Sequence, residues 1–187
     1  MYEPNTEVDL ERYAKILSRT PDLLRRLLGD LPDALLEANY GAGTWSAREV
    51  MSRMIYEEQY EWIPSARRLM DGEDVIPPEF VDHNGRRALF RHETPDKLLE
   101  RFASLREANL AKLHSMSIGP GDLARRGRHP DLGFVTLGQL LATWMVHDLC
   151  HIANICKAMA LACSQEAGPW QAYLSILTAP IEKRGYS

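Results

Sequence analysis

Apolar residues recur along most of the chain in steps of three and four, the spacing of one face of an α-helix. Clusters of Pro, Gly, Asn and Asp separate these stretches, and strand-like alternation does not persist beyond a few residues. The pattern predicts helices at about 7–18, 21–30, 46–71, 95–116 and 136–162, followed by a short one at about 168–178. Because Pro21 lacks a backbone donor, the first two ranges can form one kinked helix.

Several of these helices begin at recognisable caps. Residues 20–22 and 94–96 both read Thr-Pro-Asp, which places a hydroxyl at the N-cap, a proline at the first helical position and an acid in the first turn. Residues 46–49 and 136–139 have the residue types of a capping box. The four long units predict an all-α fold, a four-helix bundle with extra short helices, in a single domain over residues 1–187.

Two long connections interrupt the helical pattern, at about 72–94 and 117–135. Connections of this length in a compact domain are either functional or simple crossing segments, and both interpretations stay open. The basic residues of the second one, Arg125, Arg126 and Arg128, lie among Gly and Pro and are expected in a solvated loop.

The composition is that of a soluble globular protein, with 45% hydrophobic and 26% charged residues among 187. The net charge of -4 argues against non-specific binding to nucleic acid or to an anionic membrane. No apolar stretch approaches the roughly 18–20 residues needed to cross a bilayer, and none follows Met1 as in a signal peptide. Cys150, Cys156 and Cys163 are odd in number and lack C-x-x-C spacing, so we expect free, buried thiols in a cytoplasmic protein.

The most informative motif is a pair of histidines, His147 and His151, four residues apart within one predicted helix. Side chains at this spacing project from the same face, one turn apart, where two imidazoles can bind one metal ion. The pair belongs to a row in steps of three and four that we expect to face the core: Leu140, Trp144, His147, His151, Ile155 and Ala158. An inward histidine is more often a hydrogen-bonded core residue than a ligand, and a catalytic site normally needs a third protein ligand.

Three segments resemble the DinB/YfiT-like superfamily. Residues 44–50 (TWSAREV) are similar to the entry of that family's second helix, and residues 147–152 (HDLCHI) to its His-x-x-x-His segment. Gly168-Pro169-Trp170, with Tyr173-Leu174, resembles its C-terminal end. The resemblance implies a bundle, often dimeric, in which three histidines hold a divalent metal such as nickel or zinc. It also implies the activity of a hydrolase, an isomerase or a thiol-dependent transferase.

The resemblance carries two metal ligands onto His147 and His151, but the third falls on Arg53, eight residues after Trp45. Arginine is always protonated and offers only donors, so it cannot ligate a metal. One solution is Glu57, one turn after Arg53, as an oxygen ligand or as a catalytic base, with Glu58 and Glu61 rotated away.

Two further solutions stay open. Arg53 can replace the ion, pair with Glu57 and contact an anionic ligand, or His83 or His92 of the long connection can supply the missing ligand. The simplest alternative is that Arg53 and Glu57 form an ordinary surface ion pair.

Other candidate residues have structural interpretations. The four tryptophans are expected to be core or interface anchors: Trp45, Trp62, Trp144 and Trp170. His114 lies at the C-terminus of a predicted helix, where a positive charge is favourable. The sequence contains neither G-x-S-x-G nor a phosphate-binding glycine loop. Two functions are predicted. The resemblance implies a zinc- or nickel-dependent hydrolase or thiol-transferase-like enzyme acting on a small molecule. The departure at Arg53 favours instead a metal-free, dimeric bundle that binds a small ligand.

Overall fold

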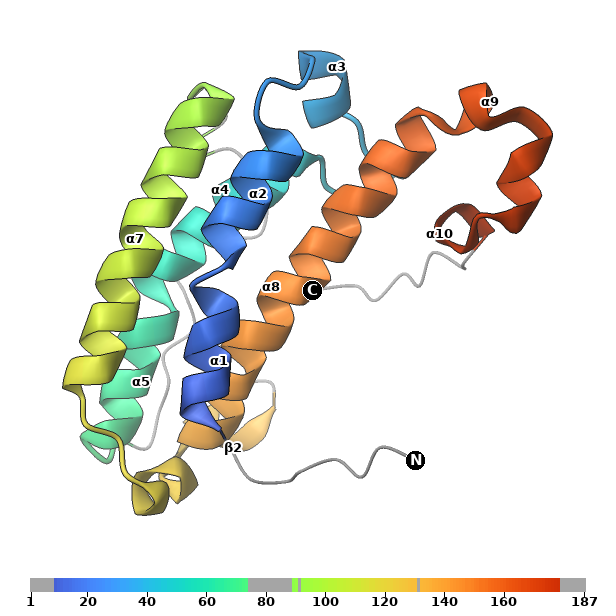
Figure 1. The fold of residues 1–187 in the computed structure, drawn as a ribbon. Coiled ribbons are helices and arrows are strands. Elements are labelled where there is room, and N and C mark those ends of the chain that lie inside the picture. The colour runs from blue at the N-terminus through green and yellow to red at the C-terminus, as the bar shows by residue number, and fades with distance from the viewer. Residues whose placement is uncertain (1–8, 74–88, 91, 131, 179–187) are drawn as a thin grey trace.

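The computed structural model describes residues 9–73, 89–90, 92–130 and 132–178, and nearly all of its regular structure is helical (Figure 1). The elements in chain order are α1 (Leu10–Leu17), α2 (Thr20–Leu28), α3 (Asp33–Leu36), α4 (Ala47–Tyr60), α5 (Trp62–Met70), α7 (Pro95–Ser115), η1 (Pro120–Ala124), β1 (Arg126–His129), β2 (Gly133–Thr136), α8 (Leu137–Ala162), α9 (Ser164–Ala167), η2 (Gly168–Tyr173) and α10 (Ser175–Thr178).

Four long helical units lie side by side, which confirms the predicted four-helix bundle. They are α1 followed by α2, α4 followed by α5, α7, and α8 (Figure 1). Helix α7 packs on α4 and α2, whereas α8 packs on α1, α4 and α5. Two predicted capping boxes are present: Ser46 with Glu49 begins α4, and Thr136 with Gln139 begins α8.

Prolines divide two of the four units. A proline lacks the N–H that would donate to the carbonyl four residues earlier. Pro64 thereby separates α5 from α4, so the single helix predicted at 46–71 is wrong and breaks at Glu61. Pro21 separates α2 from α1 and leaves the Leu17 carbonyl without a helical partner. The predicted N-cap at Thr20 is also wrong, because α2 already includes this residue and Arg19 is its N-cap.

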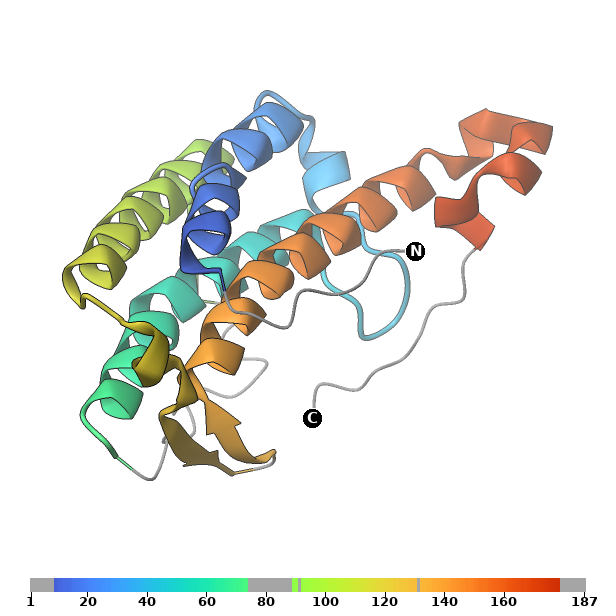
Figure 2. The ribbon, with the colours of Figure 1, turned by 60° about the horizontal axis from the view of Figure 1, so that its bottom comes forward.

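The connection after α7 contains regular structure that the sequence pattern did not predict. After η1, strands β1 and β2 form an antiparallel hairpin in which Arg126 pairs with Thr136 and His129 with Gly133. Arg126 and Arg128 are therefore strand residues rather than parts of a loop. The hairpin lies at the end of the bundle where α8 begins, and α9, η2 and α10 lie at its opposite end (Figure 2).

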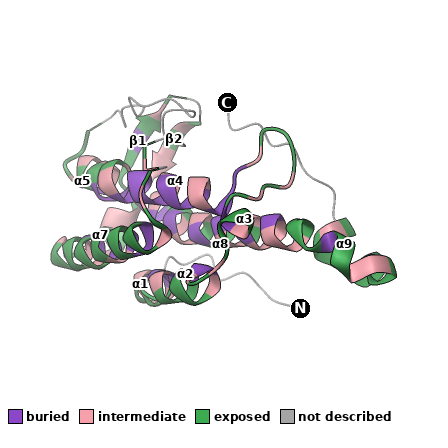
Figure 3. Cartoon of the chain, turned by 90° about the horizontal axis from the view of Figure 1, so that it is seen from above, coloured by how far each residue is buried: buried purple, intermediate pink, exposed green. Residues whose placement is uncertain are grey.

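Two apolar clusters fill the bundle. One contains mainly residues of α2, α4 and α7, such as Leu24, Ile55 and Phe102, and the other contains residues of α1, α5 and α8, such as Leu17 and Trp144. Buried residues gather where these helices face one another (Figure 3). Along α4–α5, α7 and α8, polar buried residues stand between the apolar positions of the two clusters, so a polar layer separates them.

Two expectations about individual side chains need correction. Cys150 and Cys163 are exposed and Cys156 is half-buried, so the thiols are free as expected but not buried. Trp170 is 72% exposed and is not a core anchor, unlike the other three tryptophans.

Among the residues that the structure describes, none of the helices has both the length and the apolar character required to span a membrane.

Candidate metal centre

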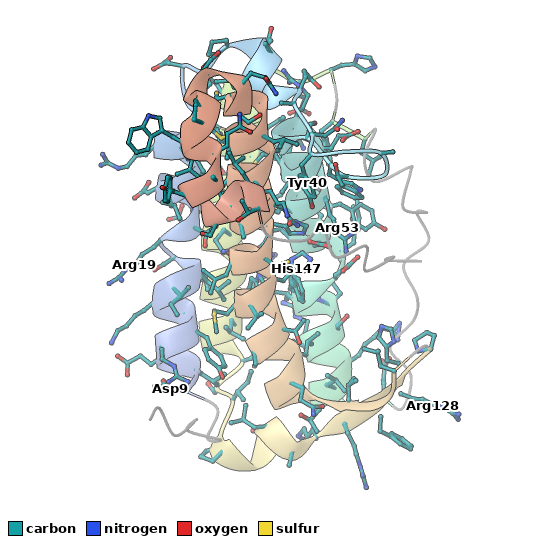
Figure 4. All side chains as sticks on the ribbon, turned by 90° about the vertical axis from the view of Figure 1, so that its right-hand side faces the viewer. Asp9, Arg19, Tyr40, Arg53, Arg128 and His147 are labelled. Atoms are coloured by element: carbon teal, nitrogen blue, oxygen red, sulfur yellow. The ribbon has the colours of Figure 1, made fainter. Side chains whose placement is uncertain are left out.

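Glu57, His147 and His151 come together in the polar layer between α4 and α8. Both histidines lie on the inward row of α8, where the neighbouring row positions Trp144 and Ile155 are buried. Glu57 is 1% exposed, near the C-terminal end of α4. We call these three residues the Glu-His-His group. Its His147 side chain lies near Arg53, on the side of the bundle where α4 and α8 are neighbours (Figure 4).

The distances within the Glu-His-His group suit a metal ion. The Nε2 atoms of His147 and His151 are 3.0 Å apart, and His147 Nε2 lies 3.3 Å from Glu57 Oε1. One ligand atom from each of the three residues lies within 4.8 Å of the other two. Ligands bound tetrahedrally to zinc at roughly 2.0–2.1 Å are about 3.3–3.4 Å from one another. The three side chains could therefore bind one ion with little rearrangement.

The Glu-His-His group has unused hydrogen-bonding capacity, which fits a site that takes a ligand. Glu57 Oε2 and His151 Nδ1 are buried without a partner. Buried polar atoms nearly always have a hydrogen-bond partner in native proteins. Two atoms without one in the same cluster therefore indicate a site for a missing partner. Two imidazole nitrogens and a carboxylate oxygen form a donor set that divalent zinc or nickel accepts readily.

The electrostatic environment favours the ligand forms of Glu57 and His151. Burial, and then the charge of neighbouring His147, lowers the pKa of His151 to about 3, so its ring is neutral near pH 7. Burial raises the pKa of Glu57, but the charge and hydrogen bond of His147 and the charge of Arg53 outweigh burial and lower it to about 2. A neutral imidazole beside an ionised carboxylate is the state in which metals bind.

Arg53 lies beside the Glu-His-His group. Its Nε donates to Glu57 Oε1 at 2.7 Å, and its guanidinium lies over the Trp45 ring, 5.2 Å from the ring centroid. The side chain is only 13% exposed and that of Glu57 only 1%. Arg53 and Glu57 therefore do form an ion pair, but the interpretation that it lies on the surface is wrong. Position 53 faces inward, as the resemblance implies.

The remaining sequence candidates do not join this group. His92 is exposed, and His83 lies outside the described residues. Glu61 is not among the described residues whose ligand atoms converge. Glu58 points away from the Glu-His-His group, as expected from its position one residue further along α4, but its surroundings were not predicted.

Glu58 belongs to a second buried cluster, which we call the Arg106 network. Its members are Glu58 of α4, Arg106 and Asn109 of α7, and Trp144 and Asp148 of α8. Arg106 donates to Glu58 Oε1 through Nε and Nη2, at 3.1 and 2.8 Å. It donates to Asp148 through Nη1 and Nη2, at 2.6 and 2.9 Å. Nη1 also donates to the Leu17 carbonyl at 2.8 Å, the group that Pro21 leaves without a helical donor.

The other two members donate to Glu58. The Trp144 indole donates to Glu58 Oε1 at 2.8 Å, and the Asn109 amide donates to Oε2 at 2.9 Å. Burial raises the pKa of Glu58 above its ordinary value, and the contact with Arg106 only partly opposes this shift. Four N–H donors face this carboxyl group, so the ionised form fits the network best. Burial lowers the pKa of Arg106, but the carboxylates of Asp148 and Glu58 outweigh burial and raise it.

Sequence reasoning missed the Arg106 network, although a signal was present. In α7 the positions Leu99, Phe102, Arg106, Asn109 and Leu113 follow steps of three and four. Two polar residues within an apolar row indicate a buried polar cluster.

Comparisons with known proteins agree with this fold. Residues 16–155 match the family model of the DinB superfamily, and this range includes the whole Glu-His-His group. A relative from Oceanobacillus iheyensis, named "putative metal-dependent hydrolase", is 24% identical over 157 residues, 81% of this chain and 88% of its own length. A relative of the same name from Bacillus mycoides is 24% identical over 156 residues, 80% of this chain and 85% of its own.

One solved structure resembles the chain closely in its fold. It is YfiT from Bacillus subtilis, described as "a probable metal-dependent hydrolase with an unusual four-helix bundle topology". The two share 19% of their residues with a TM-score of 0.67, and the match covers 89% of this chain and 94% of YfiT. At this identity the likeness shows the fold alone.

Proposed function

The chain belongs to the DinB superfamily, and from this premise we propose that it is a divalent-metal-dependent hydrolase of a small-molecule substrate. The convergence of three ligand atoms of Glu57, His147 and His151 within 4.8 Å, inside a buried layer, carries the proposal. Catalytic metal sites typically combine three protein ligands with an open position. Two relatives named as putative metal-dependent hydrolases support the same reaction class.

Each residue of the site has a role in this proposal. Such a site, when loaded, supplies Lewis-acid chemistry to the reacting bond. His147 and His151 bind through Nε2 as neutral rings. Glu57 would hold the ion through Oε1, the oxygen that faces His147, and its second oxygen is buried beside it. Arg53 holds Glu57 in place and adds a fixed positive charge at the edge of the site.

Elemental analysis of protein purified without a histidine tag tests the metal. We expect one equivalent of zinc or nickel in the wild type and none in His147→Ala/His151→Ala. A matched control is His92→Ala/His114→Ala, which removes two exposed histidines outside the group and keeps the metal. A wild type that holds no metal, even after incubation with zinc or nickel, would contradict the proposal.

A reaction screen then separates the two enzyme classes. We expect the metal-loaded protein to hydrolyse esters or amides, with loss of activity in Glu57→Gln. Turnover that requires a low-molecular-weight thiol would instead identify the thiol-transferase-like class.

The pairing of Arg53 with Glu57 supports a second candidate function. Arg53 Nε already donates to Glu57 Oε1 at 2.7 Å, so a guanidinium stands beside the carboxylate where a cation would be bound. In this case the chain is a metal-free bundle that binds a small anion such as a carboxylate. Carboxylate binding by metal-free protein that is lost in Arg53→Met, without zinc or nickel binding, would favour this function.

We also propose that the chain forms a homodimer, as its family resemblance implies. Sedimentation equilibrium of the full chain measures this directly, and a mass of one chain at all concentrations would contradict it.

A further inference from the structure

A single guanidinium contacts the neighbours of two candidate ligands. Glu58 follows Glu57 on α4, and Asp148 follows His147 on α8. Arg106, from α7, binds both of these neighbours. Helix α7 contributes no residue to the Glu-His-His group. Arg106 therefore reaches, from a third helix, the residue next to a candidate ligand on both α4 and α8.

The geometry of this contact restrains both helices. Successive residues of an α-helix differ by about 100° in direction and about 1.5 Å in height. When Glu58 is held, α4 cannot rotate or slide without breaking its bonds to Arg106, so the direction of Glu57 is set as well. The same holds for α8, because Asp148 receives two donors from Arg106, at 2.6 and 2.9 Å. The Trp144 indole, which donates to Glu58 at 2.8 Å, adds a direct link between α4 and α8.

We propose that Arg106 is a positioning residue for the candidate metal centre. By binding Glu58 and Asp148 at once, it holds α4 and α8 at the rotation and separation that the three ligands need. This inference rests on the proposed function, since the quantity it controls is metal affinity. When residues that orient metal ligands without binding the ion themselves are removed, metal affinity typically falls about 10–100-fold.

A purely structural network would behave differently. It would lower the stability of the fold but leave the surviving folded protein with an unchanged site. The test therefore needs a variant that removes the network without leaving a buried charge unpaired, because one unpaired charge alone can unfold a domain. The triple variant Glu58→Gln/Arg106→Met/Asp148→Asn meets this condition, and its amide at position 58 can still accept from Trp144.

Cobalt(II) is the probe, since its visible absorption reports ligand geometry as well as binding. Affinity is measured by chelator competition at a temperature where circular dichroism shows each variant folded. We expect the triple variant to bind cobalt(II) about 10–100-fold more weakly and with an altered spectrum. Arg106→Lys, which keeps the charge but lacks the planar fork, should fall between it and the wild type.

Leu98→Ala is the matched control. Leu98 is buried on the same helix, 2% exposed, within the apolar cluster of α2, α4 and α7. This variant should lower the thermal midpoint while it keeps the wild-type affinity and spectrum. Wild-type affinity and spectrum in the triple variant would overturn the inference but leave the proposed function intact.

If the wild type binds no cobalt(II), the proposed function is contradicted. A second measurement, which needs no metal, still tests the positioning role of Arg106 in that case. Crystal structures of the metal-free wild type and triple variant give the separation of Glu57 Oε1 from His147 Nε2, which is 3.3 Å here. We expect a longer separation in the triple variant. An unchanged separation would overturn the positioning role of Arg106.

Discussion

Two polar clusters lie next to each other inside this bundle, and adjacent residues of α4 and α8 belong to different ones. Glu57 and His147 belong to the Glu-His-His group, whereas Glu58 and Asp148 belong to the Arg106 network. In the described part of the chain, no buried side-chain oxygen or nitrogen of the network lacks a partner. The Glu-His-His group instead leaves Glu57 Oε2 and His151 Nδ1 unpaired. This unequal pairing separates a cluster that stabilises the fold from one that is suited to a ligand.

The two clusters also differ in the role of their arginine. Arg106 is 1% exposed and contacts two carboxylates on different helices. Arg53 is 13% exposed and contacts a carboxylate on its own helix, four residues away. Removal of Arg106 should therefore affect the fold first, and removal of Arg53 should affect the site first.

The largest effect should come from breaking the Arg106 network. Arg106→Met leaves two buried carboxylates without their cation, and we expect the free energy of unfolding to fall by about 3–5 kcal/mol. Urea denaturation measures this loss. Arg101→Met is the control. Arg101 lies on the same helix as Arg106 but forms a partly exposed ion pair with Glu93, so its loss should change the free energy of unfolding by less than about 1 kcal/mol. Equal losses in the two variants would contradict the difference drawn here between buried and exposed pairs.

The next effect should appear only when the Glu-His-His group is loaded. Zinc present at about 100 times its Kd should stabilise the wild type by about 2.7 kcal/mol, because the ion binds the folded state. His151→Ala should show no zinc-dependent shift, whereas the exposed His114→Ala should keep it. Calorimetry with and without zinc provides the comparison, and a shift retained in His151→Ala would place the ion elsewhere.

A smaller effect is expected at the boundary of the site. Arg53→His removes a positive charge beside the ion and adds a third imidazole, so zinc or nickel affinity should rise roughly tenfold or more, about 1.4 kcal/mol. Chelator competition measures the gain. Arg67→His, which adds a histidine at an exposed position of α5, should give none. No gain in Arg53→His would show that position 53 does not face the ion.

The smallest effect should come from the start of α4. Ser46 accepts from the Glu49 backbone in the capping box, and Ser46→Ala should lower the free energy of unfolding by about 1 kcal/mol. Metal affinity should stay unchanged, because the cap lies about three turns from Glu57 and outside both polar clusters. If metal affinity fell in proportion to the loss in free energy of unfolding, the geometry of the site would depend on the stability of α4 as a whole.

Local sequence determined the helices and much of the inward face of α8. Caps such as Ser46 with Glu49 depend on residues within one turn, so they can be read without knowledge of the rest of the chain. The spacing of His147 and His151 likewise placed both rings on one face, next to buried Trp144. The resemblance to the DinB superfamily added position 53 to that face, and Glu57 followed as its neighbour one turn later.

Only the tertiary structure decided which residues of different helices meet. Glu57 and Glu58 have the same chemistry and adjacent positions, yet the rotation of α4 directs one to the histidines and the other to Arg106. Rotation and stagger between helices arise from the packing of the whole bundle, including the break at Pro64 and the Leu17 carbonyl that Arg106 satisfies. Because such contacts join residues as distant in the sequence as Glu57 and His147, which are 90 positions apart, no local spacing in the sequence encodes them.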